Sequence, residues 1–140
     1  MKESTATSTG GCLCGAVRYE VRGSLRPIVV CHCGQCRRAT GHVMAATAAR
    51  RSAFRLVSGE ELRWYASSAA ARRGFCGRCG STLFWEGAGR DYLSIAAGSL
   101  DDPGQLGVGY HIFVADKVPY DAIGDSAPRS ADGTFAVDWS

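Results

Sequence analysis

The stretch Gly10–Arg22, GGCLCGAVRYEVR, combines a close pair of cysteines with the pattern of a β-strand. Apolar and charged residues alternate over Val17–Val21, which is the two-residue period of a half-buried strand. In an extended chain, residues i and i+2 project to the same side, so Cys12 and Cys14 present two sulfurs together. The stretch therefore predicts a strand that begins beside a chelating pair.

The rest of the chain predicts further short strands separated by turns. Ile28–Val30 is typical of a buried strand. The alanines of Val43–Ala49 also permit a helix, but the flanking glycine and β-branched residues favour a strand. Alternation on both sides of Ser58-Gly59-Glu60 predicts a hairpin over residues 54–64. The other predicted strands are Thr82–Trp85, Tyr92–Ala96 and Val108–Ala115, and turns or loops are predicted at Gly23–Pro27, Ser67–Ala71 and Asp101–Gly104.

Length and composition define a single small domain. The chain has 140 residues, 46% hydrophobic and 21% charged, and its 18 glycines favour a turn-rich β architecture. We expect a mainly β fold of several short, curved antiparallel sheets over residues 10–125, a flexible tail over residues 1–9 and a coil over residues 126–140. No apolar run reaches the roughly 18 residues of a membrane span, and the first residues show no signal-peptide pattern. We therefore expect a soluble, cytoplasmic protein.

The balance of charges bears on the class of partner. The formal net charge is +3, from 14 arginines and 2 lysines against 13 acidic residues. The dipeptides Arg37-Arg38, Arg50-Arg51 and Arg72-Arg73 would suit a zinc-ribbon-like module that binds nucleic acid or protein without catalysis. Acidic residues are interspersed, however, and lysine is scarce, so the chain has no strongly basic footprint. We do not expect nucleic acid as the main partner.

Seven cysteines in three clusters are the strongest chemical signal, because they read C-x-C, C-x-C-x-x-C and C-x-x-C. Their odd number and the absence of an export signal argue against a disulfide framework. Zinc takes four protein ligands in structural sites and three, with one open position, in catalytic sites. The spacing therefore predicts two zinc ions per chain: a closed structural site on Cys12, Cys14, Cys76 and Cys79, and an open site on Cys31, Cys33 and Cys36.

Other arrangements of the cysteines stay open at this point. One four-cysteine site could stand beside spare thiols, with His32, His42 or His111 completing a second site. In an extended strand, His32 would point away from the cysteines on either side of it, which disfavours it as a ligand. A redox role for the C-x-x-C pair is a further alternative, but no βαβ unit surrounds it. The C-x-x-C spacings of Cys33–Cys36 and Cys76–Cys79 predict tight turns. An iron–sulfur cluster fits such turns less well than zinc does.

Four segments match the pattern of a known family. Gly11–Tyr19 (GCLCGAVRY) is similar to an opening motif G-x-C-x-C-G-x-V-x-[YF], and Cys31–Arg37 (CHCGQCR) to a core motif C-H-C-x-x-C-[RQ]. Phe75–Leu83 (FCGRCGSTL) resembles F-C-x-x-C-G-[ST]-x-L, and His111–Tyr120 resembles H-I-[WF]-x…K-x-P-[WY]. The match spans residues 10–125 and includes every cysteine in order. On these motifs the chain resembles the glutathione-dependent formaldehyde-activating enzyme family, which includes centromere protein V.

The resemblance implies a β-rich zinc-binding fold with the same division of the cysteines, in which Cys31, Cys33 and Cys36 hold a catalytic zinc. It also implies the family's activity, the condensation of glutathione with formaldehyde to S-hydroxymethylglutathione, which is classed as a carbon–sulfur lyase reaction. The implied partners are a small thiol such as glutathione and an aldehyde. The chain is shorter than the enzymes that name the family, and Tyr120 stands where tryptophan is common, so the thiol and aldehyde stay open.

The candidates for substrate binding follow from the charge of such a thiol. Glutathione carries two carboxylates, and arginine binds a carboxylate through two parallel hydrogen bonds. Arg37 and Arg38 directly follow the last cysteine of the core motif and are the nearest candidates, with Arg72 and Arg73 next. His111 is a further candidate near the site. A thiol at the open zinc would lose its proton near neutral pH and attack the carbonyl carbon of the aldehyde.

Overall fold

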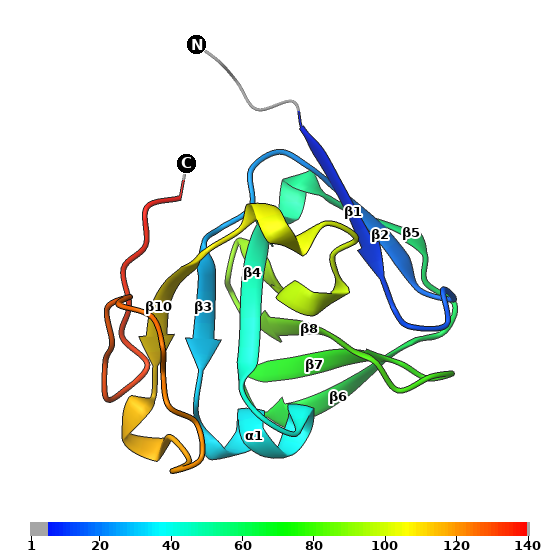
Figure 1. Ribbon diagram of the computed structural model, residues 1–140. Helices are drawn as coiled ribbons and strands as arrows, with labels where there is room; N and C mark the ends of the chain where they lie inside the picture. The colour runs from blue at the N-terminus through cyan, green and yellow to red at the C-terminus, as the bar shows by residue number, and fades with distance from the viewer. Residues whose placement is uncertain (1–5, 140) are drawn as a thin grey trace.

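The structure is a computed structural model that describes residues 6–139, and its regular structure consists mainly of ten strands in two sheets (Figure 1). The mainly β fold expected from the sequence is therefore confirmed. The strands are β1 (Thr7–Gly11), β2 (Arg18–Arg22), β3 (Ile28–Cys31), β4 (Met44–Arg50), β5 (Phe54–Ser58), β6 (Leu62–Ser68), β7 (Ala71–Cys76), β8 (Thr82–Gly87), β9 (Tyr92–Ala96) and β10 (Val108–Ile112).

The smaller sheet has three antiparallel strands in the order β1-β2-β5. The larger has seven, in the order β10-β3-β4-β9-β8-β7-β6, and its neighbours are antiparallel except for the parallel pair β10 and β3. Figure 1 shows β3 and β4 running in a different direction from β7 and β8, so the larger sheet is strongly curved. This curvature brings the end of β3 and the start of β7 onto one concave face, where they line the same cavity.

Helical structure is confined to short pieces. The α-helix α1 (Gly34–Thr40) follows β3 and ends at Gly41, which has a positive φ of 89° and donates to the Arg37 carbonyl. Four single 3₁₀ turns are η1 (Arg51–Ala53), η2 (Ala97–Ser99), η3 (Pro103–Gln105) and η4 (Val114–Asp116). Within residues 6–139, no helix has the length and apolar character needed to cross a membrane.

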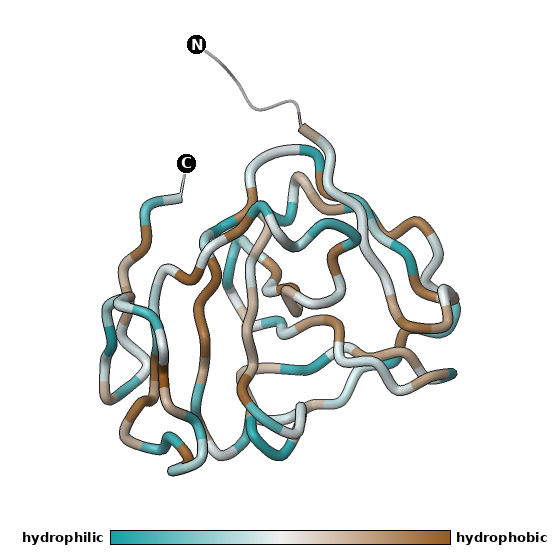
Figure 2. Tube along the Cα trace, viewed as in Figure 1, coloured by the Kyte–Doolittle hydropathy of each residue, from teal (hydrophilic) through white to brown (hydrophobic). Residues whose placement is uncertain are grey.

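The core lies between the two sheets and is centred on aromatic rings. Phe84 of β8 packs edge-on against Tyr19 of β2 and Phe54 of β5, with ring centroids 5.5 and 5.4 Å apart. The Trp64 ring of β6 stacks on the same Phe84 at 6.1 Å. Figure 2 shows a second hydrophobic run along β3, which is buried at Val29 and Val30. Apolar residues from both sheets thus bury the strand faces that the alternating pattern identifies.

Three expectations about local structure need correction. Residues 7–9, expected in the N-terminal tail, begin strand β1; residues 1–5 lie outside the described residues. The predicted hairpin over residues 54–64 is wrong, because β5 pairs with β2 while β6 pairs with β7. Phe54 of β5 and Leu62 of β6 both face the common core, so both strands show alternation. The turn between them nevertheless connects two different sheets. Of the segment Ser67–Ala71, expected as a loop, only residues 69–70 form a turn, and the rest belongs to the ends of β6 and β7.

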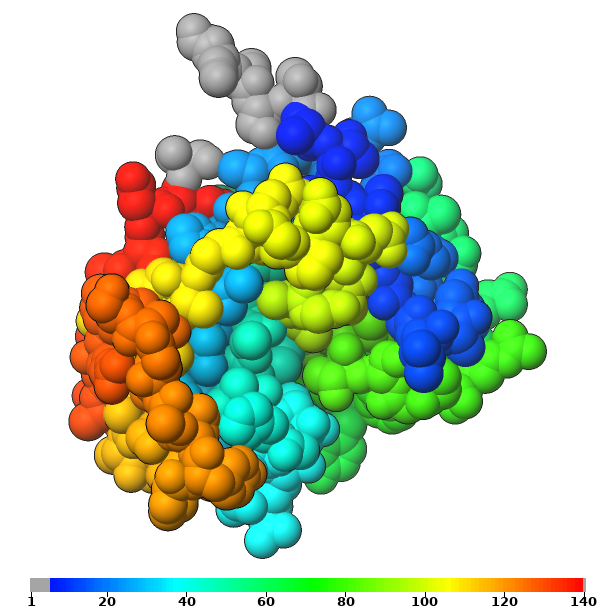
Figure 3. Space-filling model, in the orientation of Figure 1, coloured from blue at the N-terminus to red at the C-terminus, as the bar shows by residue number. Residues whose placement is uncertain are grey.

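The C-terminal segment, residues 117–139, packs back onto the large sheet beside β10 (Figures 1 and 3). The Phe113 amide donates to the carbonyl of Asp132 (2.7 Å), and the Ser130 amide donates to the carbonyl of His111 (2.9 Å). Over residues 126–139 the segment has no helix or strand apart from an isolated bridge at Arg129. It is therefore an irregular segment that covers one side of the sheet.

Candidate metal centres

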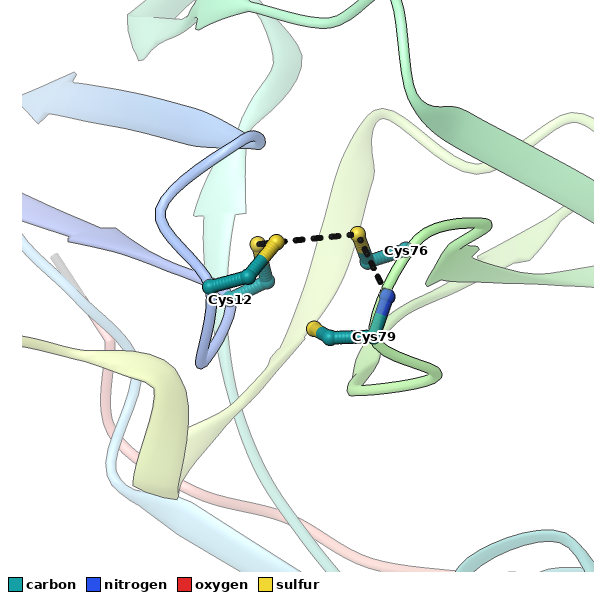
Figure 4. A group of neighbouring side chains, drawn as sticks. Cys12, Cys76 and Cys79 are labelled. Atoms are coloured by element: carbon teal, nitrogen blue, oxygen red, sulfur yellow. Dashed lines mark hydrogen bonds between the residues drawn. The ribbon is translucent and has the colours of Figure 1, made fainter.

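The first cysteine cluster joins two loops that are more than sixty residues apart in sequence. Cys12 and Cys14 lie in the loop between β1 and β2, and Cys76 and Cys79 in the turn between β7 and β8. Their four sulfur atoms lie within 4.8 Å of one another. Figure 4 shows the side chains of Cys12, Cys76 and Cys79 directed toward a common centre. Four thiol ligands around one point are the donor set of a closed metal site.

Backbone amides support the thiolate form of this cluster. The Val17 amide donates to Cys12 Sγ at 3.2 Å, and the amides of Arg78 and Cys79 donate to Cys76 Sγ at 3.3 and 3.4 Å. Hydrogen bonding from the Ser81 hydroxyl lowers the pKa of Cys79 to about 5. Hydrogen bonds to a charged form favour it, so these loops are arranged for sulfur ligands that have lost their protons.

The second cluster lies where β3 meets α1. Cys31 ends β3, Cys33 caps the N-terminus of α1, and Cys36 lies in its first turn. Their three sulfurs also lie within 4.8 Å of one another. The Cys36 amide donates to Cys33 Sγ at 3.3 Å. The sequence predicted a tight turn here, whereas the structure has the start of a helix. Within residues 6–139, no histidine, carboxylate or further cysteine joins these three cysteines as a fourth ligand.

Arg73 of β7 is the charged neighbour of this second cluster. Its Nη2 atom donates to Cys36 Sγ at 3.4 Å and to Gln35 Oε1 at 2.8 Å. Hydrogen bonding from Cys31, reinforced by the Arg73 guanidinium, lowers the pKa of Cys36 to about 6, although burial acts in the opposite direction. The same contact with Cys36 and burial raise the pKa of Cys31 well above its usual range. Cys36 thus ionises before Cys31.

A cavity of about 410 Å³ opens beside the second cluster, and all three of its cysteines line it. Arg73 and the buried Arg26 contribute positive charge to its wall. Aromatic side chains form much of the remaining wall: Trp85, Tyr92, Phe113 and Phe135. A concave, largely apolar space with a few convergent polar groups is the usual form of a small-molecule site.

The histidines do not complete the second cluster. His32 Nε2 contacts His111 Nδ1 at 2.9 Å, and His111 Nε2 contacts the Asp125 carboxylate at 3.0 Å. His42 lies 3.9 Å from the Asp121 carboxylate and stacks on the Tyr120 ring. The three histidines thus contact one another or acidic side chains, and none of them belongs to the three-cysteine group.

The structure separates the arginines proposed for substrate binding. Arg37 and Arg38 lie on α1 and do not line the cavity, and neither does His111. Arg72 pairs with Glu86, whereas its neighbour Arg73 faces the cavity. A strand places adjacent residues on opposite faces, so the sequence contained a signal that one of this pair faces inward. Nothing local in the sequence marks Arg26, which reaches the cavity from the loop before β3.

Comparison with known proteins agrees with this arrangement. The family model described as glutathione-dependent formaldehyde-activating enzyme matches residues 7–116. A solved crystal structure of a Rhodobacter sphaeroides protein has 26% sequence identity, covers 87% of this chain and 99% of its own, and superposes with a TM-score of 0.58. The family match spans both cysteine clusters and most strands of both sheets. The chain belongs to the glutathione-dependent formaldehyde-activating enzyme family.

Proposed function

We propose that this protein is a zinc-dependent enzyme of the carbon–sulfur lyase type, which joins a small thiol to an aldehyde. Membership of the family makes glutathione and formaldehyde the first pair to test. The observation that carries the proposal is the three-cysteine cluster, whose sulfurs line a cavity that a small molecule can enter. A three-ligand site beside a cavity is the arrangement of a catalytic metal, because an exogenous ligand can complete the coordination.

We assign two zinc ions to the chain with different roles. The four cysteines Cys12, Cys14, Cys76 and Cys79 form a closed set, which suits a structural zinc that holds the β1–β2 loop to the β7–β8 turn. Cys31, Cys33 and Cys36 are assigned to the catalytic zinc. The residues fit zinc because every ligand is a thiol and amides donate to several of the sulfurs.

The reaction forms one carbon–sulfur bond. When bound, a zinc ion with three sulfur ligands lowers the pKa of a thiol in its fourth position. The thiol sulfur then bonds to the carbonyl carbon, the π electron pair of the aldehyde moves to its oxygen, and that oxygen takes the proton that the thiol gave up. The chain's own contribution is to orient the two reactants: Met44 and Ile112 line an apolar wall beside the cysteines, and Arg73 adds positive charge at Cys36.

The alternative of a nucleic-acid or protein-binding module without catalysis has less support. Arg50 pairs with Asp91, while Arg51 and Arg72 both pair with Glu86. Arg73 of the third dipeptide is buried. Paired and buried arginines do not form the continuous basic surface that phosphate binding needs.

All seven cysteines are unpaired, which suits a reducing compartment, and we propose that the protein works in the cytoplasm.

The test measures adduct formation by zinc-loaded protein. Exchange spectroscopy with ¹³C-formaldehyde and glutathione gives the rate of S-hydroxymethylglutathione formation above the uncatalysed background. We expect the protein to accelerate it, and Cys36→Ser to remove both the acceleration and one zinc per chain. Circular dichroism checks that the variant keeps the parent fold. A Cys36→Ser protein that kept two zinc ions and full activity would refute the assignment.

A further inference from the structure

Two arginines at the cavity are buried without a carboxylate partner. Arg26 is 4% exposed and Arg73 is 8% exposed. Arg26 Nη2 donates to the Ala46 carbonyl at 2.9 Å, and Arg73 donates to Gln35 and Cys36, so their protein partners carry no carboxylate charge. Arg73 Nη1 is buried and has no hydrogen-bond partner among the described residues. The Cys36 sulfur is the anionic group beside Arg73, and the hydrogen-bond partners of Arg26 are neutral carbonyls. Burial of a charge that is not fully paired is costly, so these positions favour an additional anion.

Other arginines of the chain show the contrasting arrangement. Seven of them lie within salt-bridge distance of an aspartate or glutamate: Arg18, Arg22, Arg50, Arg51, Arg55, Arg63 and Arg72. These seven side chains are all more than one-third exposed, where water would already screen their charge. The carboxylates of the chain therefore pair with exposed arginines, whose charge water already stabilises. The two buried arginines at the cavity have no carboxylate partner.

The cavity is also free of negative side chains. Arg26, Arg73 and Arg90 line it, and no aspartate or glutamate of the described residues does. Three thiolates around one divalent zinc would carry a net charge of −1. The three arginines carry +3, so the net charge around the cavity stays positive. Burial lowers the pKa of Arg26 to about 10, which still leaves it charged at neutral pH. An anion is favoured here, whereas an ammonium group would find no carboxylate in the wall.

Aromatic rings define the space around these charges. The Arg26 guanidinium lies 5.6 Å from the Tyr92 ring centroid and 5.5 Å from that of Phe135. Phe113 and Phe135 line the cavity, and Phe135 belongs to the C-terminal segment, which covers the side of β10 in Figure 3. That residue lies beyond the part of the chain that matches the family model, residues 7–116. Part of the cavity wall thus comes from a segment outside the family match.

We propose that this cavity selects a substrate with a carboxylate and an apolar body and without an ammonium group, in preference to glutathione, and that Arg73 binds the carboxylate. The proposal rests on the proposed function for the reaction that follows, but the binding step is separate from it. Glutathione carries an ammonium group on its γ-glutamyl end, for which the cavity has no counter-charge. A guanidinium with a free N–H beside the Cys36 sulfur can hold the carboxylate and fix the ligand's orientation.

Binding is tested with three probes of equal carbon number on the zinc-loaded full chain: 3-phenylpropionate, 3-phenylpropanamide and 3-phenylpropylamine. Isothermal titration calorimetry should give an affinity for the carboxylate at least about tenfold above that for the amide, and no measurable binding of the amine. Arg73→Gln should reduce carboxylate binding about tenfold or more at unchanged zinc content, and Arg73→Lys should restore part of it. Arg22→Gln, an exposed arginine of β2, removes the same charge away from the cavity and should leave binding unchanged.

Equal affinity for the carboxylate and the amide would overturn the proposal. So would carboxylate binding that is unaffected by Arg73→Gln in a fully zinc-loaded protein, because the metal would then be the group that holds it. In the adduct assay, 3-mercaptopropionate should be used with a higher kcat/KM than cysteamine or glutathione. If charge-selective binding is found but no thiol reacts, the proposed function fails and the binding proposal stands. If adducts form without selection by charge, the reverse holds.

Discussion

The Nε2 atom of His32 lies 2.9 Å from the Nδ1 atom of His111, and this contact joins the Cys31–Cys33 segment to strand β10. His111 Nε2 faces both oxygens of Asp125 at 3.0 and 3.1 Å, so it donates to that carboxylate and its Nδ1 atom accepts. His32 Nε2 is then the donor of the pair. Burial and the nearby His111 lower the pKa of His32, which agrees with a neutral ring. The two imidazoles therefore position the Cys31–Cys33 segment, which carries the first two cysteines of the open cluster.

His111→Ala should weaken that cluster without touching its ligands. The change leaves the buried His32 donor without a partner, which costs about 1–3 kcal/mol of stability. It also frees the Cys31–Cys33 segment, so zinc affinity of the three-cysteine site should fall about tenfold. Denaturant unfolding and competition with a chromogenic chelator measure the two effects. Asp125→Asn keeps an acceptor oxygen beside His111 and should have a smaller effect. Unchanged zinc affinity in His111→Ala would exclude a positioning role.

Chelation should remove zinc from the protein in two phases. The four-cysteine site is closed, and the three-cysteine site lines a cavity that a chelator can enter. We expect one zinc per chain to leave early with little change in circular dichroism. The second should leave slowly and together with loss of structure, since it holds the β1–β2 loop to the β7–β8 turn. Cys36→Ser should abolish the early phase. A single phase with one zinc per chain in both proteins would contradict two sites.

The cysteine spacing predicts both clusters because chelation by close pairs is a local property of the chain. Cys12 and Cys14 approach within the β1–β2 loop and not in the extended geometry expected for them, and Cys76 and Cys79 approach through a tight turn. Close spacing brings each pair together in either geometry, so neither pair needs the fold to be known. The strands over Tyr92–Ala96 and Ile28–Cys31 follow from their apolar patterns in the same way. Partner choice is different. A strand pattern identifies which face is buried and leaves open which strand lies beside it, so the pairing of β5 with β2 could not be read from the sequence.

The cavity wall is the part of the site that local pattern reasoning missed. Arg26 and Phe135 are more than a hundred residues apart in sequence, and no spacing rule connects them. They meet because the C-terminal segment folds back beside β10. The candidates nearest in sequence to the cysteines, Arg37 and Arg38, point elsewhere because α1 carries them past the cavity. Residues adjacent in sequence to a metal ligand are thus a weak guide to what surrounds the metal.

Phe84→Ala should cause a large loss of stability, since this ring is the point where both sheets meet. Phe84 is 1% exposed and packs against the rings of Tyr19, Phe54 and Trp64. Removal of such a side chain costs about 3–5 kcal/mol. Chemical denaturation of the zinc-loaded variant measures this loss. The matched control is Phe113→Ala, which removes an equal ring from the cavity wall outside that core and should cost less. Equal losses in the two variants would place the main core elsewhere.

Asp101→Asn should lower stability at neutral pH and have no effect in strong acid. Arg18 donates to the Asp101 carboxylate from two nitrogens and Thr9 from its hydroxyl, which lowers the pKa of Asp101 from 3.8 to about 2. A lowered pKa means that the ionised form is bound more favourably in the folded state. The contribution is therefore complete above about pH 4 and is lost as the pH falls through 2.

The size of that contribution is limited by solvent. The side chains of Arg18 and Asp101 are 37% and 47% exposed, so screening keeps the difference between parent and variant below about 1 kcal/mol. Urea unfolding of both proteins at matched pH values from 7 to 2 measures it, and zinc loss in acid affects both equally because the cysteines are unchanged. The two stabilities should converge near pH 2. A difference that persisted undiminished at pH 2 would show that the amide disturbs packing between β1 and the η2–η3 loop rather than removing a charge.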